Sequence, residues 1–336
     1  IDREQLMQRP SLTRRRFITI AAAAAGAALA GRNARADDAV RWRGSALGAQ
    51  VSIEIHHGDR AAADRLVRRS LAEVRRLENL FSLYQSGSAI STLNRTGILV
   101  APDPDMVALL RAALSFAELT GGAFDPTVQP LWQLYAAHFS AENADPNGPS
   151  AARLAQALAK VGHDGVLVST ERVALKRRGA GVTLNGIAQG YVTDRVADLL
   201  RGAGLSTTLI DMGEVRALGA RPDGTPWRIG LADADRPGRL SAQLAIVDRA
   251  VATTSGAGFR FDSAGRFTHL FDPATGRSPS RYRSLSVVAP TATEADALST
   301  AFSLMDMTHI RTVVAKRPGL QVRAIDADGA EIGIGV

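Results

Sequence analysis

The order of hydrophobic and polar residues predicts a hairpin followed by a long helix. Residues 50–55 alternate between polar and apolar with the period of two that is typical of a half-buried strand, and residues 41–45 are expected to pair with them. Residues 59–80 instead follow the helical period, which predicts an amphipathic helix with a basic, solvated outer face. Its apolar positions are Leu66, Val67, Leu71, Val74, Leu77 and Leu80.

Further helices and strands follow without a strict strand–helix–strand alternation. Helices are expected at 105–119 (ending at Thr120-Gly121-Gly122), 151–161, 293–305 and 308–316. Short strands are expected at 206–211, 227–231, 240–247, 251–254, 266–271, 284–289 and 321–325. This mixture predicts an α+β fold, built as one large domain or as two intimately packed lobes.

The segment from Val182 to Tyr191 is the most informative stretch of this pattern. It predicts a short strand at 182–184, a tight turn at Asn185-Gly186, and an amphipathic helix to about residue 200. A helix that starts at such a turn leaves unpaired N–H groups and a positive dipole end at one place. We therefore expect a phosphate-binding turn here.

The first residues predict an export signal rather than a part of the fold. Residues 13–18 contain a twin-arginine pattern, residues 18–29 form a short apolar run, and Ala34-Arg35-Ala36 fits a cleavage site. The apolar run is shorter than the roughly 20 residues that a membrane-spanning anchor needs. We expect residues 1–36 to be a Tat-type signal peptide, residues 37–336 to be one functional domain, and the protein to be periplasmic without membrane insertion.

Charge and cysteine content narrow the function classes. The formal net charge of the chain is +7, but residues 1–36 carry seven arginines against Asp2 and Glu4, which leaves +2 for the remainder. Because most of the positive charge lies in residues 1–36, the net charge is poor evidence for nucleic-acid binding. The chain has no cysteine, which excludes disulfides, thiolate metal sites and cysteine nucleophiles.

Four polar clusters could carry chemistry: Asp125 in a turn, Asp211 and Glu214 after a strand, His269 with Asp272, and Asp296 with Thr300. Asp296 and Thr300 lie four residues apart on one helical face and supply two hard oxygen donors, which suits Mg²⁺. The structural alternative is that Asp296 favours the first turn of a helix and that Thr300 packs inside. A phosphate-binding turn and a Mg²⁺ site together suggest chemistry on a nucleotide or pyrophosphate.

Eight motifs in order resemble the ApbE-like family of FAD:protein FMN transferases, over about residues 44–326. They are Leu47-Gly48-Ala49, Phe81–Tyr84 with Ile90–Asn94, Phe124–Leu131, Leu184–Tyr191, Asp211-Met212-Gly213, Thr254-Ser255-Gly256, His269–Gly276 and Glu294–Thr300. The chain departs from the usual pattern at several positions, among them Leu47, Ala49, Thr183, Gln189 and Glu214. The resemblance implies a T-fold-related architecture.

The resemblance also implies a reaction and roles for single residues. Such enzymes split FAD and attach its FMN half to a Ser or Thr hydroxyl of a target protein, releasing AMP. The resemblance implies that the Gly186 carbonyl, Asp296 and Thr300 bind Mg²⁺. It also implies that His269 is the base that accepts the proton of the target hydroxyl. The residues implied to line the FAD site are Leu47, Tyr84, Ala123, Phe124, Asp125, Thr183, Gln189 and Phe271.

The twin-arginine pattern and the version of the 184–191 motif are similar to a NosX-like subgroup tied to nitrous oxide respiration. The implied target is then the periplasmic, flavin-carrying part of a NosR-type membrane protein. Two alternatives stay open at this point: a Mg²⁺-dependent FAD pyrophosphatase that uses water, and a non-catalytic FAD-binding assembly protein.

Overall fold

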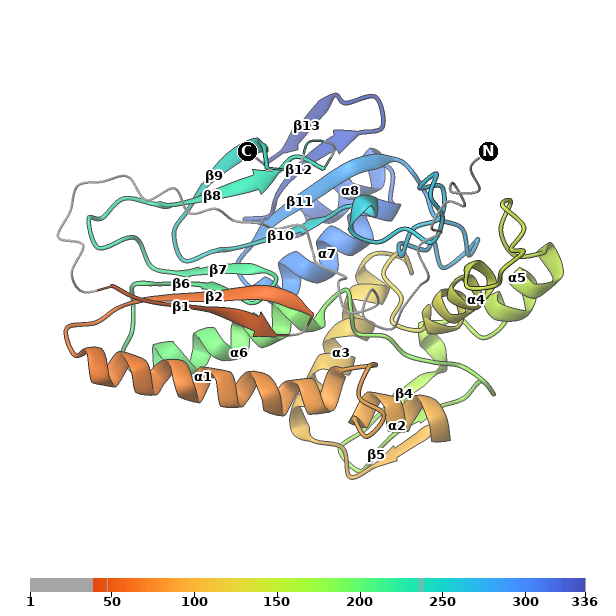
Figure 1. Cartoon of the computed structure of the whole chain (residues 1–336), viewed down its shortest axis with the longest axis horizontal. Coiled ribbons are helices and arrows are strands. Elements are labelled where there is room, and N and C mark those ends of the chain that lie inside the picture. The colour runs from red at the N-terminus through yellow and green to blue at the C-terminus, as the bar shows by residue number, and fades with distance from the viewer. Residues whose placement is uncertain (1–38, 47, 235, 237, 336) are drawn as a thin grey trace, which may run out of the picture.

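An antiparallel sheet of eight strands forms the centre of the computed structural model, which describes residues 39–46, 48–234, 236 and 238–335 (Figure 1). The strands follow one another across the sheet in chain order, and each pairs antiparallel with its neighbour. This topology confirms the α+β expectation. The strands are β1 (Ala39–Ala46), β2 (Ala49–His56), β6 (Thr208–Asp211), β7 (Val215–Leu218), β10 (Ala250–Thr254), β11 (Tyr282–Ala289), β12 (Gln321–Asp326) and β13 (Glu331–Ile334).

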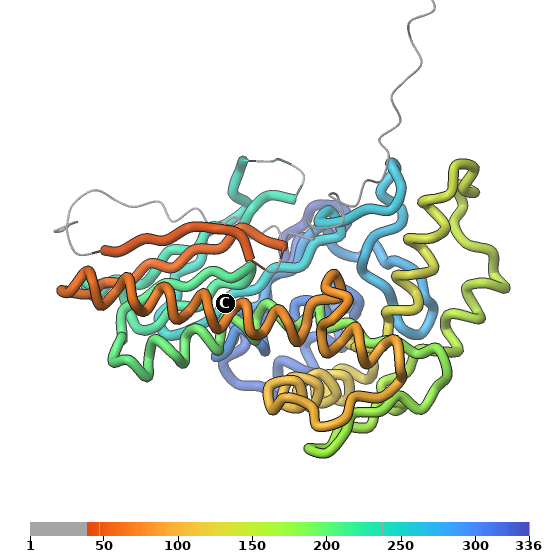
Figure 2. Tube along the Cα trace, turned by 60° about the horizontal axis from the view of Figure 1, so that its bottom comes forward, coloured from red at the N-terminus to blue at the C-terminus, as the bar shows by residue number. Residues whose placement is uncertain are grey.

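Helices cover one face of this sheet. The longest, α1 (Arg60–Phe81), lies under β1 and β2 in Figure 1 and in front of the sheet in Figure 2. The predicted hairpin and the predicted helix are both confirmed, because β2 buries Val51, Ile53 and Ile55 against this layer. The other helices that pack into this core are α3 (Pro104–Leu119), α6 (Ala188–Gly202), α7 (Ala292–Leu304) and α8 (Met307–Ala315).

The opposite face of the sheet is covered in part by a hairpin of β8 (Trp227–Ala232) and β9 (Leu240–Ile246). Trp227, Ile229 and Leu231 of β8 pack against apolar residues of β7, β10 and β11 in a second core. All four residues of β7 are therefore buried, although alternate side chains point to opposite faces of a strand. Because β7 is packed on both faces, its residues do not alternate between polar and apolar.

A smaller region lies beyond the end of the helical layer. It contains α4 (Gln129–Phe139), α5 (Ala151–Leu158) and the segment between β10 and β11, which are held together by an aromatic core around Tyr135 (Figure 1). Next to it, β3 (Ile98–Val100), β5 (Arg172–Leu175) and β4 (Val166–Val168) form a three-stranded antiparallel sheet beside α2 (Ala89–Thr96). Buried residues of α2, β4 and β5 belong to the main core.

Two predicted strands are wrong. Residues 182–184 have no strand partner, and residues 266–271 form only an isolated bridge between Arg260 and Thr268. An apolar run becomes a strand only where a neighbouring backbone can pair with it, and the sequence alone does not show that neighbour. The helix predicted at 151–161 ends at Leu158, and α2, α4 and the short strands β3, β4, β5, β7 and β13 were not predicted.

Within the described part of the chain, no helix is both long enough and apolar enough to cross a bilayer. The predicted signal peptide and its cleavage site lie outside the described residues, and so does Leu47.

Candidate active site

A cleft lies where the helical layer, the α4 region and the end of the large sheet come together. It contains about 1020 Å³ of empty space, a part of which is open solvent. Six separate segments of the chain contribute to its walls. The lining residues that carry the argument below are Trp132, Gly186, Glu214, His269, Asp296 and Thr300.

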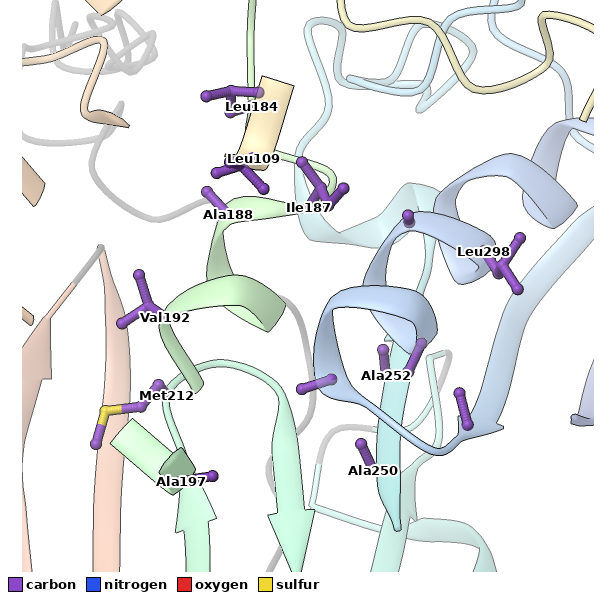
Figure 3. Close-up of a cluster of buried hydrophobic side chains, with 14 of the residues drawn as sticks. Leu109, Leu184, Ile187, Ala188, Val192, Ala197, Met212, Ala250, Ala252 and Leu298 are labelled. Atoms are coloured by element: carbon purple, nitrogen blue, oxygen red, sulfur yellow. The ribbon is translucent and has the colours of Figure 1, made fainter. Parts of the chain in front are cut away.

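The turn that precedes α6 forms one wall of the cleft. Leu184 and Ile187 are buried in the main core and anchor the turn there (Figure 3). In place of a neighbouring strand, the Asn94 side chain donates to the Val182 carbonyl (2.8 Å) and accepts from its N–H (2.6 Å). The Thr183 N–H donates to the Pro126 carbonyl at 2.7 Å. A side-chain amide and a loop carbonyl thus satisfy backbone groups that a sheet would otherwise pair.

The beginning of α6 packs directly on α7. The Gly190 N–H donates to Oδ2 of Asp296 at 2.9 Å. A Cβ on Gly190 would lie 2.3 Å from the Ala292 carbonyl oxygen, so only glycine allows this approach. The phosphate-binding turn stays a prediction, and one N–H of the helix that follows it has a partner within the protein. An amide of this helix end is already paired with the protein's own carboxyl group, which lies where the helix dipole favours negative charge.

Asp194 fixes the start of α7 from the second turn of α6. Its carboxylate accepts hydrogen bonds from the Ala292 N–H (2.9 Å), the Thr293 N–H (2.8 Å) and the Thr293 hydroxyl (2.6 Å). Arg216 of β7 forms a largely buried ion pair with it at 2.6 Å. These bonds supply partners for N–H groups that a helix start leaves free. As a result, the face of α7 that carries Asp296 and Thr300 is held toward the cleft.

The three residues predicted to hold a cation, Gly186, Asp296 and Thr300, all line this cleft. A Cβ on Gly186 would lie 3.0 Å from Oγ1 of Thr300, so the turn and α7 are in close contact. Burial raises the pKa of Asp296 to about 7, and the Gly190 N–H opposes that rise. A bound cation would remove the penalty of burying this charge. A carboxylate, a hydroxyl and a carbonyl are hard donors, so the set fits Mg²⁺ completed by substrate or water oxygens.

Among the described residues, no group of three or more His, Cys, Asp or Glu side chains could hold a metal ion. The fit for Mg²⁺ rests on the mixed donor set that Gly186, Asp296 and Thr300 offer in the cleft.

His269 lies on the wall of the cleft in an irregular segment, not at the end of a strand as predicted. Its Nδ1 lies 3.3 Å from the Phe259 carbonyl oxygen, which can only accept, so the proton is assigned to Nδ1. Burial lowers the pKa of His269, so the ring is neutral near pH 7. Nε2 then carries the lone pair that a general base needs.

The residues expected around FAD fall into three groups. Ala123, Phe124, Asp125, Thr183, Gln189 and Phe271 all line the cleft. Tyr84 is not among the described lining residues and is 52% exposed, and Leu47 lies outside the described part of the chain.

The Asp125 carboxylate is occupied by the protein itself. Its Oδ1 accepts from the Thr127 N–H (2.7 Å) and hydroxyl (2.5 Å), and its Oδ2 accepts from the His163 N–H (3.0 Å). These bonds tie the turn before α4 to the turn before β4, so Asp125 shapes the wall of the cleft.

Several lining residues were not predicted as site residues. Trp132 gave no signal, because an aromatic residue on a short helix is ordinary core composition. Glu214 was named in a polar cluster that could carry chemistry but was given no role there, and it is 2% exposed. Thr253, Thr254 and Ser255 come from the end of β10.

Comparison with known proteins places the chain in a family. The model of the ApbE family matches residues 47–324. The chain belongs to the ApbE family.

Relatives of known name extend this match over most of the chain. The FAD:protein FMN transferase of Treponema pallidum is 30% identical over 294 residues, which cover 78% of this chain and 80% of that protein. The FAD:protein FMN transferase of Escherichia coli K12 is 30% identical over 264 residues, covering 75% and 74%.

Solved structures of ApbE proteins share the fold. The ApbE protein of Thermotoga maritima superimposes with a TM-score of 0.77 at 30% identity, over 88% of this chain and 96% of that one. The flavin transferase ApbE from Vibrio cholerae gives 0.75 at 24% identity, over 88% and 97%. The fold is thus that of ApbE proteins, and the ApbE motifs at 184–191, 269–276 and 294–300 all contribute residues to the cleft.

Proposed function

We propose that this chain is a FAD:protein FMN transferase that uses Mg²⁺ to move the FMN half of FAD onto a Ser or Thr hydroxyl of a target protein. Family membership and the names of its relatives support the transferase activity. The observation that carries the finer proposal is the shared cleft, in which a neutral His269 and the oxygens of Gly186, Asp296 and Thr300 meet.

Each group then has one task. The acceptor hydroxyl oxygen attacks the phosphorus of the FMN phosphate, the bond from that phosphorus to the bridging oxygen breaks, and AMP leaves with that oxygen. The hydroxyl proton passes to Nε2 of His269, while Nδ1 stays bonded to the Phe259 carbonyl. Mg²⁺, when bound, would neutralise charge on the pyrophosphate. Gly186, Asp296 and Thr300 would hold that cation, and Asp194 and Gly190 keep Asp296 in place.

The cleft wall supplies the remaining conditions. Phe124, Trp132 and Phe271 give the cleft apolar and aromatic surface, which a flavin or adenine ring can stack on.

The test is a reconstituted transfer reaction. Purified protein is incubated with FAD, Mg²⁺ and a protein domain that carries an acceptor Thr, and mass spectrometry detects the added FMN while chromatography detects AMP. FMN and AMP without flavinylated domain would identify a pyrophosphatase instead. Intact FAD with stable binding under every acceptor condition would identify a non-catalytic binding protein.

Two variants assign the roles within this reaction. Asp296→Ala should remove the response to Mg²⁺ and nearly all transfer, whereas His269→Ala should slow transfer and leave FAD affinity largely intact. His309→Ala is the matched control, because His309 is exposed on α8. Normal turnover by the His269 variant would refute its role as the base.

We further propose that the protein works in the periplasm after export by the twin-arginine route, on the flavin-carrying part of a NosR-type membrane protein. The sequence at 13–36 and the version of the 184–191 motif support this proposal. Replacing Arg14 and Arg15 with lysine should keep the protein in the cytoplasm. Mass spectrometry of periplasmic proteins after incubation with FAD and Mg²⁺ should find FMN on that target and not on unrelated proteins.

A further inference from the structure

Glu214 is a buried acid that the mechanism above does not use. It lies in the tight turn between β6 and β7, where Gly213 has a φ of 103° and Met212 is fully buried. Its side chain is 2% exposed and lines the cleft. Among the described residues, its Oε2 has no hydrogen-bond partner. Buried polar atoms are nearly always paired, so an unpaired carboxyl oxygen at a ligand cleft indicates a partner that binds there.

The surroundings of Glu214 are negative. Burial raises the pKa of Glu214, and the nearby Asp296 and Asp211 raise it further, while the Thr253 backbone N–H lowers it. Within the described residues, no Lys, Arg or His side chain forms an ion pair with Glu214 or with Asp296. The adjacent Arg216 is paired with Asp194 instead.

A buried acid beside a second buried acid is costly unless a positive charge neutralises both. Neither acid has a protein cation, and both line the same cleft as the Thr300 hydroxyl and the Gly186 carbonyl. Two carboxylates balance the charge of one divalent cation. Hard cations such as Mg²⁺ bind through oxygen ligands, among them carboxylates. A cation with two protein carboxylates needs no substrate phosphate to be held.

We propose that Glu214 is a further ligand of the divalent cation, so that Glu214 and Asp296 together hold the ion before FAD binds. The inference deepens the proposed function, because it assigns another ligand to the cation of that same site. The free enzyme would then carry its cation and present it to the arriving pyrophosphate.

Direct binding of Mn²⁺ to the purified protein without FAD tests this inference. Calorimetry and the electron paramagnetic resonance signal of free Mn²⁺ give affinity and stoichiometry without any turnover. The wild type should bind one Mn²⁺ in the cleft. Glu214→Gln should weaken the Mn²⁺ affinity at least tenfold, which is the effect that loss of a group close to a metal usually has. Asp198→Asn is the control, since Asp198 is an exposed acid on α6 that is not among the lining residues, and the Mn²⁺ affinity of this variant should change less than twofold.

Stability measured in EDTA separates a ligand from a structural residue. Glu214→Gln should melt at or above the temperature of the wild type without metal, because a neutral amide replaces an acid with no cationic partner. It should also lose most of the rise in melting temperature that Mn²⁺ gives the wild type. A lower melting temperature in EDTA combined with an unchanged Mn²⁺ affinity would overturn the inference.

A second measurement does not depend on a variant that folds. Crystals of the wild type soaked in Mn²⁺ without FAD should give an anomalous peak in contact with oxygens of both Glu214 and Asp296. A peak on Asp296 alone, or no Mn²⁺ binding without FAD, would overturn the inference. Either result would leave the proposed function standing if FMN transfer still required Mg²⁺. If the wild type bound Mn²⁺ through both acids but transferred no FMN, the proposed function would be refuted and the cation site would stand.

Discussion

Gly190→Ala tests the contact that positions the acid of the site. Gly190 lies in the first turn of α6, and its N–H donates to Asp296 at 2.9 Å. The added Cβ would lie 2.3 Å from the Ala292 carbonyl oxygen and 2.8 Å from Cβ of Asp296, where ordinary contacts begin at 3.4 Å. The two helices must therefore separate by about 1 Å locally, because neither neighbouring atom is the end of a flexible side chain.

The size of the effect follows from three contributions. Overpacking of this kind costs about 1–3 kcal/mol. Weakening a hydrogen bond to a carboxylate costs about 1.5–3 kcal/mol. The better helix propensity of alanine returns up to about 1 kcal/mol. We expect a net loss of about 1.5–6 kcal/mol in the free energy of unfolding. Transfer should fall about 100-fold, since a displacement near 1 Å in a catalytic site has that effect.

Urea unfolding followed by circular dichroism measures the stability, and the FMN-transfer assay measures the activity. Gly202→Ala is the matched control, because Gly202 ends the same helix and a Cβ there meets nothing within 4 Å. It should leave transfer unchanged and alter stability by no more than about 1 kcal/mol. Wild-type stability and wild-type transfer in Gly190→Ala would refute the close packing of α6 on α7 as the device that positions Asp296.

Three further outcomes are expected. Gly186→Val pushes on the Thr300 hydroxyl and on Phe124, so transfer should fall at least tenfold while the urea midpoint moves little; an equal loss of both would contradict a role in the site. The rate of transfer should rise with pH and reach half its maximum below pH 6.5, since burial lowers the pKa of His269 and the neutral ring is the active form; this limb should vanish from the pH profile of His269→Gln. Asn94→Leu should destabilise the fold by about 2–4 kcal/mol in urea, because it leaves the Val182 N–H and carbonyl unpaired, and an unchanged midpoint would show that other groups pair them.

Local patterns predicted much of the fold. The alternation at 50–55 and the helical period of α1 show which side chains of each element face the core. Both patterns depend only on residues that are close in sequence. The same holds for Asp296 and Thr300, whose spacing of four places them on one face of α7. Residues 182–184 and 266–271 have apolar runs of the same kind, but no neighbouring strand is there to pair with them.

The candidate site was predicted less completely, for the same reason. The resemblance to ApbE proteins brought His269, Gly186 and Asp296 to attention, and the structure places all three on one cleft. It did not predict that Asp125 is bonded to Thr127 and His163, because those partners depend on how two turns meet. The burial of Glu214 likewise depends on how the turn between β6 and β7 packs in the fold, which the sequence alone does not show.

The sequence by itself determined the types of donor, their spacing within each element, and the family. Only the tertiary structure decided which groups pair. Asn94 satisfies Val182 across 88 residues, and the Gly190 N–H reaches Asp296 across 106. Local propensity acts over a few residues, whereas burial and hydrogen bonding act between whichever groups the fold brings into contact. That difference is why the sequence predicted the turn before α6 but not the hydrogen bond between the Gly190 N–H of that helix and Asp296 of α7.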